Sequence, residues 1–319
     1  MNRRLLESSF LFLIIGLAPI FCVAQNYPNK PIKIIIGYPP GGGADTIARL
    51  IAQPLSMALG QAVVVENRAG ADGMIAGAAV AKAAPDGYTL LLVSSSHVIN
   101  VALKKSIPYD TLQDFAPISH IADQQILLVT SLTKPFSTVP ELLKYLKDNP
   151  GVVNFGSSSS GSALPTELFR LETGTKFTHV PYKGTAPVIA DTLAGHIDLT
   201  MAGAATAIQH VKAGKLRALA VTGAKRSPQF PDTPSLSEFI PGFDVTFWSA
   251  IYAPAKTPEA IIIKLNTELV RITRNPEFQK SIRTLGADVV GSTPEELKQF
   301  TINEIGKWSR VVKQSDYKE

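Results

Sequence analysis

Residues 32–50 constrain the fold more than any other stretch, because they join an apolar strand to a helix through a run of prolines and glycines. The β-branched run at 34–36 is typical of a buried strand, and Pro-Pro-Gly-Gly-Gly at 39–43 predicts a turn. Asp45 or Thr46 then caps a predicted helix, whose apolar residues recur at helical spacing. The stretch therefore predicts a strand, a tight turn and a helix in direct succession.

A strand that ends in glycines and opens directly into a helix leaves backbone N–H groups pointing at one spot, which the helix dipole makes positive. This arrangement predicts an anion site without a basic side chain. The spacing excludes a dinucleotide fingerprint, since Thr46 stands where a third glycine belongs, and no P-loop string occurs. A plain connecting turn that needs glycine for its backbone angles is the alternative, and both interpretations stay open.

The length of 319 residues predicts two domains. With 45% hydrophobic and 18% charged residues, the chain has the composition of an α/β protein with a sizeable core. The formal net charge of +5 comes without a basic run interleaved with aromatics, which argues against nucleic acid as a partner. A mild positive balance suits small anionic ligands.

Residues 1–24 have the pattern of a cleavable signal peptide. Arg3 and Arg4 form a charged start, residues 10–23 are apolar, and small residues precede Gln25. The apolar run is short for a membrane-spanning helix. We therefore exclude residues 1–24 from the fold and expect an exported protein that begins at Gln25.

Cys22 is the only cysteine, and it lies inside the predicted signal peptide. A lipid attachment at Cys22 is the rival interpretation, which Phe21 disfavours because attachment motifs place a small residue before the cysteine. The mature chain then has no disulfide, no thiol nucleophile and no cysteine metal ligand.

Strands and helices alternate along the rest of the chain, which predicts parallel sheets whose ligands bind at the carboxyl ends of the strands. The strand at 88–93 ends in a predicted loop of Ser94, Ser95, Ser96 and His97. A second strand at 152–155 runs into a Gly/Ser loop at 156–162 and then a helix. Residues 247–252 form a strand that returns the chain to the first domain, and 294–312 form a closing helix.

The sequence gives little support to catalysis or metal binding. G-x-S-x-G is absent, and the five histidines have no short metal-ligand spacing. A serine hydrolase that uses Ser96 or Ser158 with His97 is the enzyme alternative, whereas His179 lies in an apolar strand as a structural histidine. Trp248 either contacts ligand or, as we favour, packs at a domain junction. We predict no catalytic residue, no metal and no cofactor.

Several short segments appear in an order that resembles one family, the tripartite tricarboxylate transporter substrate-binding proteins (TctC-like or Bug receptors). The resemblance covers essentially the whole mature chain. The segments are Tyr27-Pro28 with Pro31-Ile32, Pro39-Pro40-Gly41-Gly42-Gly43-Ala44-Asp45, Val64-Val65-Glu66-Asn67-Arg68, Ala84-Pro85-Asp86-Gly87-Tyr88, Asp114-Phe115, His179-Val180-Pro181-Tyr182-Lys183-Gly184, Leu219-Ala220-Val221-Thr222 and Leu285-Gly286-Ala287.

The resemblance implies an α/β fold of two domains, a periplasmic-binding-protein clamshell in which each domain is a mostly parallel sheet flanked by helices. Domain 1 is discontinuous, 25–124 plus 248–319, and domain 2 is 125–247. The implied partners are a small organic carboxylate and membrane transporter subunits, with the receptor itself a monomer. The implied ligand-binding residues are Tyr38, Pro40, Gly41, Gly42, Gly43, Ala44, Asp45, Ser95, Ser96, His97, Ser157, Ser158, Ser162, Tyr182, Lys183, Gly184 and Ala202.

Two positions depart from the family pattern. An acidic residue often follows the strand at 197–201, where this chain has Ala202-Gly203, and a histidine often starts the helix after the serine loop, where it has Leu164-Pro165-Thr166. Both departures remove polar groups near the expected cleft. We therefore expect a non-catalytic receptor for a carboxylate of unspecified identity, with a sensory receptor for a signalling partner as a further alternative.

Overall fold

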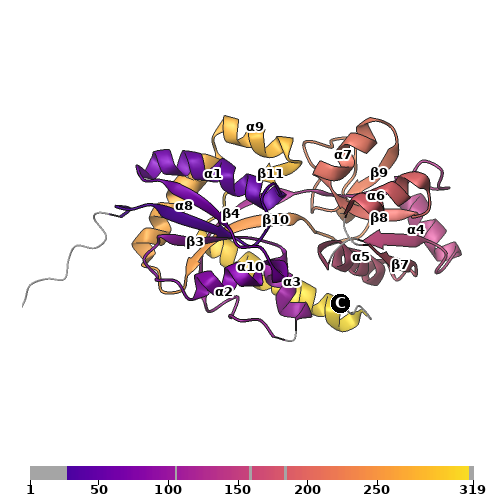
Figure 1. Ribbon diagram of the computed structural model, residues 1–319. Coiled ribbons are helices and arrows are strands. Elements are labelled where there is room, and N and C mark those ends of the chain that lie inside the picture. The colour runs from indigo at the N-terminus through magenta and orange to yellow at the C-terminus, as the bar shows by residue number, and fades with distance from the viewer. Residues whose placement is uncertain (1–26, 105, 158–159, 183–184, 316–319) are drawn as a thin grey trace, which may run out of the picture.

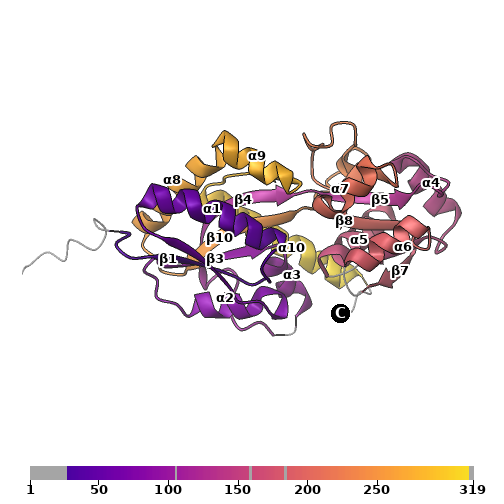
Figure 2. The ribbon, with the colours of Figure 1, turned by 45° about the horizontal axis from the view of Figure 1, so that its top comes forward.

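The computed structural model describes residues 27–104, 106–157, 160–182 and 185–315. They form two α/β lobes side by side, each a sheet with helices on both faces (Figures 1 and 2). The predicted two-sheet α/β clamshell class is confirmed. The predicted signal peptide with Cys22 lies outside the described residues. Within those residues, no helix is both long and apolar enough to cross a membrane.

The first lobe is built on a six-stranded sheet in the order β11-β4-β10-β3-β1-β2. Side chains of β1 alternate between its two faces, as the period of a strand requires. Ile34 and Ile36 face α1, α8 and α9, whereas Ile35 faces α2, α3 and α10. The strands are β1 (Ile32–Ile36), β2 (Val63–Asn67), β3 (Thr89–Ser94), β4 (Phe115–Gln124), β10 (Phe247–Pro254) and β11 (Ala287–Val289). The helices are α1 (Gly43–Leu59), η1 (Ala71–Gly73), α2 (Met74–Ala81), α3 (Ser96–Leu103), α8 (Glu259–Thr273), α9 (Pro276–Thr284) and α10 (Pro294–Gln314).

The second lobe has a five-stranded sheet in the order β7-β6-β8-β5-β9. Helices α4 and α5 pack on one face around Phe155 and Leu128, and α6 and α7 pack on the other around Leu127. The strands are β5 (Ile126–Ser131), β6 (Asn154–Ser157), β7 (Thr178–Pro181), β8 (Leu199–Gly203) and β9 (Leu216–Val221). The helices are α4 (Val139–Asp148), α5 (Ser160–Thr173), α6 (Thr185–Ala194), α7 (Ala204–Lys212) and the short η2 (Leu236–Glu238).

The two sheets are mixed, so the prediction of mostly parallel sheets is wrong. Only β1, β2 and β3 in the first sheet and β6, β7 and β8 in the second pair in parallel. The strands that carry the chain between the lobes pair antiparallel with their neighbours. The physical reason is that β10 returns from the second lobe without a crossover helix and so runs against β3 and β4.

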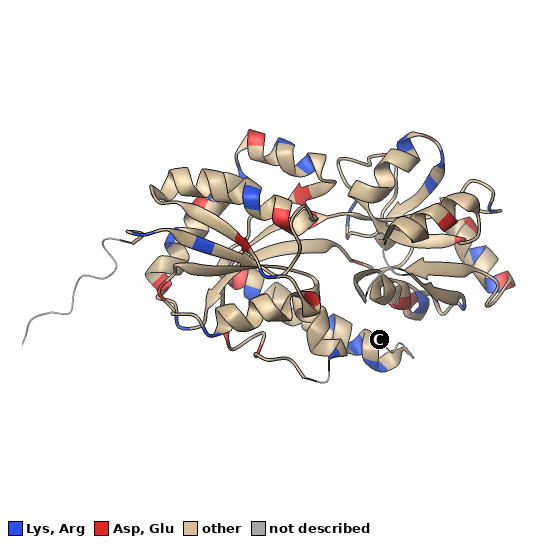
Figure 3. Ribbon diagram, in the orientation of Figure 1, with Lys and Arg blue, Asp and Glu red and all other residues tan. Residues whose placement is uncertain are grey.

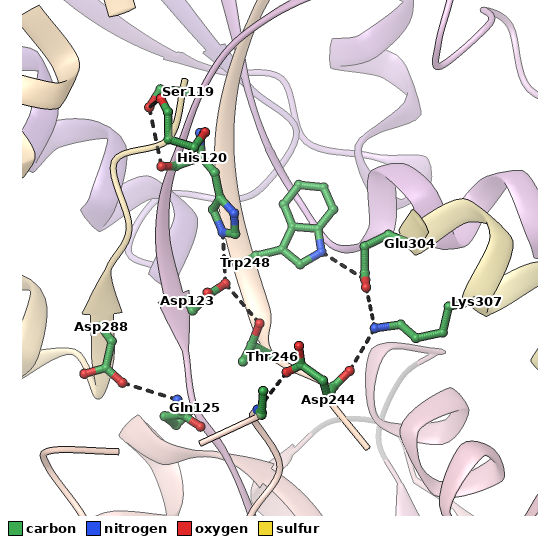
Figure 4. Close-up of polar contacts among 12 residues, drawn as sticks. Ser119, His120, Asp123, Gln125, Asp244, Thr246, Trp248, Asp288, Glu304 and Lys307 are labelled. Carbon is green, nitrogen blue, oxygen red and sulfur yellow. Dashed lines mark hydrogen bonds and ion pairs between the residues drawn. The ribbon is translucent and has the colours of Figure 1, made fainter. Parts of the chain in front are cut away.

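Polar contacts tie the two crossing segments together (Figure 4). Asp123, near the end of β4, accepts a hydrogen bond from Thr246 (3.0 Å) and lies 2.9 Å from His120 Nε2. Gln125, between β4 and β5, donates its backbone N–H to Gly286 and accepts from the N–H of Ala204 (2.8 Å). The crossing segment at Gln125 therefore contacts both lobes through its backbone.

Helix α10 packs on the first sheet, against β4, and extends along the second lobe, where it contacts α5 (Figure 1). Arg310 on α10 pairs with Glu172 on α5 at 2.7 Å. Lys307 donates to the backbone carbonyl of Asp244 at 2.8 Å (Figure 4). The C-terminal helix is thus a third connection between the lobes, beside the two crossing segments.

Trp248 is a packing residue, as the favoured interpretation of the sequence had it. The side chain is 1% exposed and lies edge-on to Phe300. Its indole N–H points at the carboxylate of Glu304 at 3.4 Å, and Trp308 donates to the same oxygen. A tryptophan enclosed in this way contributes to the junction and has little surface left for a ligand.

Candidate functional site

The glycine turn connects β1 to α1 at the carboxyl end of β1. Gly42 is the residue before the helix, with extended angles (φ −76°, ψ 167°), and α1 begins at Gly43. The prediction that Asp45 or Thr46 caps the helix is therefore wrong, because the helix starts before either residue. Of the three glycines at 41–43, only Gly41 has a positive φ (+84°), so the turn needs glycine for its backbone angles at one position.

Asp45 holds the turn in place. Its buried carboxylate accepts hydrogen bonds from the backbone N–H of Gly41 (2.9 Å), from Asn67 (2.9 Å) and from Arg49 (3.0 and 3.1 Å). The hydrogen bonds from Arg49 lower the pKa of Asp45 to about 2. Since Arg49 balances its charge and its oxygens are engaged, Asp45 does not oppose an anion in front of the turn. Pro40 and the three glycines are exposed there, and Ala44 is half-buried.

Tyr38 links the glycine turn to the loop after β3. Its hydroxyl accepts from Ser94 (2.7 Å) and lies 2.5 Å from the hydroxyl of Ser96, which also donates to the carbonyl of Asp72. Burial raises the pKa of Tyr38. Ser95 is buried before α3, and Ser96 and His97 form the first turn of α3 rather than the predicted loop. Because β1 and β3 are adjacent and parallel, both loops lie at one sheet edge.

His97 points into the core. The ring is 4% exposed and packs against Tyr109, Phe115 and Tyr252 at centroid distances of 5.2–5.7 Å. Its Nε2 atom has no hydrogen-bond partner among the described residues, and burial lowers the pKa of His97 to about 4. The hydroxyl of Ser96 is bonded to Tyr38 and Asp72 instead, so the structure does not support a Ser96–His97 catalytic pair.

We expect His97→Leu to bind ligand like the wild type. Since the pKa of His97 falls from 6.5 to about 4 on folding, the unfolded chain takes up its proton first as the pH falls. Wild-type stability should therefore decline from about pH 6.5 to pH 4, by about 3 kcal/mol at most from this residue. Urea unfolding at pH 7 and pH 4.5 should show a smaller decline for His97→Leu. Equal declines in the two proteins would contradict this assignment.

The second lobe places serines at the end of β6 and the start of α5. Ser157 ends β6 and is 3% exposed, and Ser162 in α5 is 5% exposed. Both serines lie beside the carboxyl end of β6 but are mostly enclosed by protein. Three of the residues implied by the resemblance lie outside the described residues: Ser158, Lys183 and Gly184.

Tyr182 directly follows β7 and Ala202 lies on β8, the two strands that pair with β6. The hydroxyl of Tyr182 donates to Asp191 at 2.6 Å, and this hydrogen bond raises the pKa of Tyr182 to about 12. Ala202 is 3% exposed and packs in the apolar core beside Leu127. The next residue, Gly203, is more open and precedes the first residue of α7. Backbone at Gly203 is therefore nearer the surface than the side chain of Ala202.

Gln124 is a residue that the sequence analysis missed. It ends β4 and donates a side-chain hydrogen bond to the carbonyl of Leu285 (2.8 Å). Its Oε1 atom lies 3.9 Å from the position of a Cβ on Gly43 and 3.7 Å from that of a Cβ on Gly203. The starts of α1 and α7, one from each lobe, thus meet at one glutamine. No local motif marks Gln124, because only the crossing of β4 between the lobes brings these glycines to it.

His179 is the second residue whose contact the sequence did not predict. Its Nε2 atom lies 2.6 Å from the hydroxyl of Ser157. A serine and a histidine at this distance are the elements of a nucleophile and base pair, but the 3% exposure of Ser157 leaves no access to a substrate. In the described part of the chain, no three His, Cys, Asp or Glu side chains gather in a way that could hold a metal ion.

The charged residues at the glycine turn, Asp45 and Arg49, pair with each other. Figure 3 shows Lys, Arg, Asp and Glu interspersed over both lobes, without a stripe of one sign on the face in view. The glycine turn itself offers backbone N–H groups at the positive end of a 17-residue helix. The chemistry of this edge is therefore hydrogen-bond donation from neutral groups to an anion.

Sequence comparison finds similar proteins over most of this chain. A model of the tripartite tricarboxylate transporter family receptor matches residues 47–317. Protein BugT of Bordetella pertussis is 38% identical over 300 residues, which cover 92% of each chain.

Solved structures extend the comparison. A Rhodopseudomonas palustris protein with adipate is 34% identical, with a TM-score of 0.76, and the alignment covers 90% of this chain and 97% of that one. MatC of the same species with bound malate is 30% identical, with a TM-score of 0.72, and covers 90% and 100%. A ligand-free solute-binding protein from Polaromonas is 26% identical, with a TM-score of 0.81, and covers 91% and 100%.

Proposed function

Because this chain belongs to the tripartite tricarboxylate transporter receptor family, we propose that it captures a small carboxylate in the periplasm for a transporter of that type. The ligand is a di- or tricarboxylate or a related organic anion, held between the two domains without catalysis. Relatives with adipate and malate support this ligand class. Export by the leader at 1–24, action as a monomer and delivery to membrane subunits are parts of the same proposal.

The observation that carries the proposal is the meeting of two helix starts at Gln124. Gly43 begins α1 in the first lobe, and Gly203 precedes α7 in the second. Each start has N–H groups without a partner within the helix, although the first one of α7, that of Ala204, already donates to the carbonyl of Gln125 at 2.8 Å. Charge-assisted hydrogen bonds to such groups are short and strong. A ligand with an anionic group at each end satisfies both helix starts, whereas a neutral ligand leaves them without a charge to stabilise.

The crossing segments supply the hinge in this proposal. We take domain 1 as 25–124 plus 248–319 and domain 2 as 125–247, with rotation about the segments that carry Gln125 and Thr246. A ligand that contacts both lobes stabilises the conformation in which they are close, by its differential affinity for that conformation. The link from Arg310 to Glu172 then constrains the direction of the movement.

The test is a calorimetric titration of the purified mature protein with adipate, malate and their dimethyl esters. We expect a dicarboxylate to bind and its diester to bind at least a hundredfold more weakly, because the ester lacks the charge. Salt should weaken binding only modestly, since a closed site is poorly screened. Equal affinity for acid and ester would contradict the anion site. Release of methanol from an ester, followed by mass spectrometry, would instead support the hydrolase alternative.

A further inference from the structure

Gln124 presents a free hydrogen-bond acceptor at the boundary between the two lobes. Its side-chain Nε2 donates to the backbone carbonyl of Leu285 at 2.8 Å. A carbonyl oxygen can only accept, so the NH2 half of the amide faces Leu285 and Oε1 faces away from it. No described residue donates a hydrogen bond to Oε1. Gln124 is only half-buried, which leaves its side chain within reach of a small molecule.

Two glycines, one from each lobe, leave space around this oxygen. Oε1 lies 3.9 Å from the position of a Cβ on Gly43 and 3.7 Å from that of a Cβ on Gly203. Neither glycine has a positive φ, so what they contribute here is the absence of a side chain rather than special backbone angles. The ring of Phe247 lies 3.6 Å from the same Cβ position on Gly203. One acceptor and one apolar ring therefore line this part of the lobe boundary.

The free oxygen of Gln124 discriminates against a ligand that carries acceptors only. A carboxylate oxygen accepts hydrogen bonds and cannot donate one to Oε1. A dicarboxylate with an unsubstituted carbon chain that displaces water from Oε1 leaves this acceptor unpaired, and an unpaired buried polar group is costly. A hydroxyl or ammonium group on the chain would donate to Oε1 instead. Sites built to bond a ligand's hydroxyl reject the analogue that lacks it far more strongly than apolar pockets reject a missing methylene.

We propose that Gln124 selects dicarboxylates that carry a hydrogen-bond donor, a hydroxyl or an ammonium group, on the carbon chain between the carboxylates. The donor bonds to Oε1, and the neighbouring methylene lies against the ring of Phe247. The inference rests on the proposed function, because it takes the ligand to lie between the start of α1 and Gly203. It goes beyond that function by naming the substituent that the ligand carries and the side chain that recognises it.

The experiment is a calorimetric titration at pH 7 with succinate, malate and aspartate, which share a four-carbon skeleton and differ in one substituent. At this pH the carboxylates are ionised and the amine of aspartate is protonated. We expect the wild type to bind malate, aspartate or both about tenfold or more tightly than succinate, and the tighter of the two identifies the donor as hydroxyl or ammonium. Gln124→Met, which has a similar length but no acceptor, should bring the three affinities to within a fewfold of one another.

Two further variants make the result decisive. Gln299→Met changes an exposed glutamine of α10 and should keep the wild-type ratio of affinities. Gln124→Glu places a negative charge at the same position, so it should weaken succinate and malate more than aspartate, whose ammonium group pairs with it; this variant decides the question if Gln124→Met does not fold. A purely structural role would change all three affinities by one factor. Equal affinities in the wild type, or one ratio shared by wild type and Gln124→Met, overturn the selection by Gln124, whereas a wild type that binds none of the three and no adipate overturns the proposed function.

Discussion

Gly42→Val should leave the melting temperature of the ligand-free protein unchanged while it weakens carboxylate binding by tenfold or more. The angles of Gly42 (φ −76°, ψ 167°) suit valine, and a Cβ there would meet only the carbonyl of Pro39, at 3.6 Å. The new methyl groups would instead fill the space in front of the turn. A lost hydrogen bond to a charged group costs about 1.5–3 kcal/mol, which is roughly tenfold to a hundredfold in affinity.

Two glycine variants serve as controls for this experiment. Gly306→Val, in α10, places a side chain where nothing lies within 4 Å and should change binding little. Gly41→Val forces valine to a φ near +84° and should lower the melting temperature. Ligand titration and a thermal melt without ligand measure both quantities. If Gly42→Val binds like the wild type, the glycine turn is a connector and the anion site lies elsewhere.

The regular elements of the fold were predictable where local patterns were strong. The predicted strand at 88–93 agrees with β3 to within a residue, and the predicted helix at 294–312 agrees with α10 to within two. Strand β4 was missed because Pro117 and Asp123 interrupt its alternation, and its stability comes from pairing with β10 and β11. The start of α3 was missed because a run of serines is typical of a loop, although the helix begins within that run.

The candidate site was predictable only in part, for a physical reason. Glycines between a strand and a helix are a local signal, and the structure places them at an exposed helix start. Gln124 and His179 gain their positions from pairings between distant strands, which no local pattern reveals. For His97 the local signal was misleading. Its position after a strand predicted a place in the cleft, but three aromatic rings from other segments enclose it in the core.

Asp45→Ala should destabilise the protein and weaken ligand binding at once, because Asp45 anchors the turn that presents the N–H groups. The variant lacks the buried carboxylate that accepts hydrogen bonds from the Gly41 N–H, Asn67 and Arg49. We expect a loss of about 2–3 kcal/mol in the free energy of unfolding at pH 7, since hydrogen bonds to charged groups contribute about 1.5–3 kcal/mol. Asp148→Ala is the matched control: its exposed pair with Lys144 should contribute under about 1 kcal/mol.

The pH dependence of the stability difference distinguishes the effect of the Asp45 charge from a simple loss of packing. Folding lowers the pKa of Asp45 to about 2, so its contribution is complete above about pH 4 and is lost as the pH falls toward 2. The stability difference between wild type and Asp45→Ala should therefore shrink between pH 5 and pH 2.5, as measured by urea unfolding. Asp45→Asn retains an oxygen that can accept from Gly41 and should bind ligand better than Asp45→Ala. A difference that stays constant down to pH 2.5 would show that the carboxylate charge does not hold the turn.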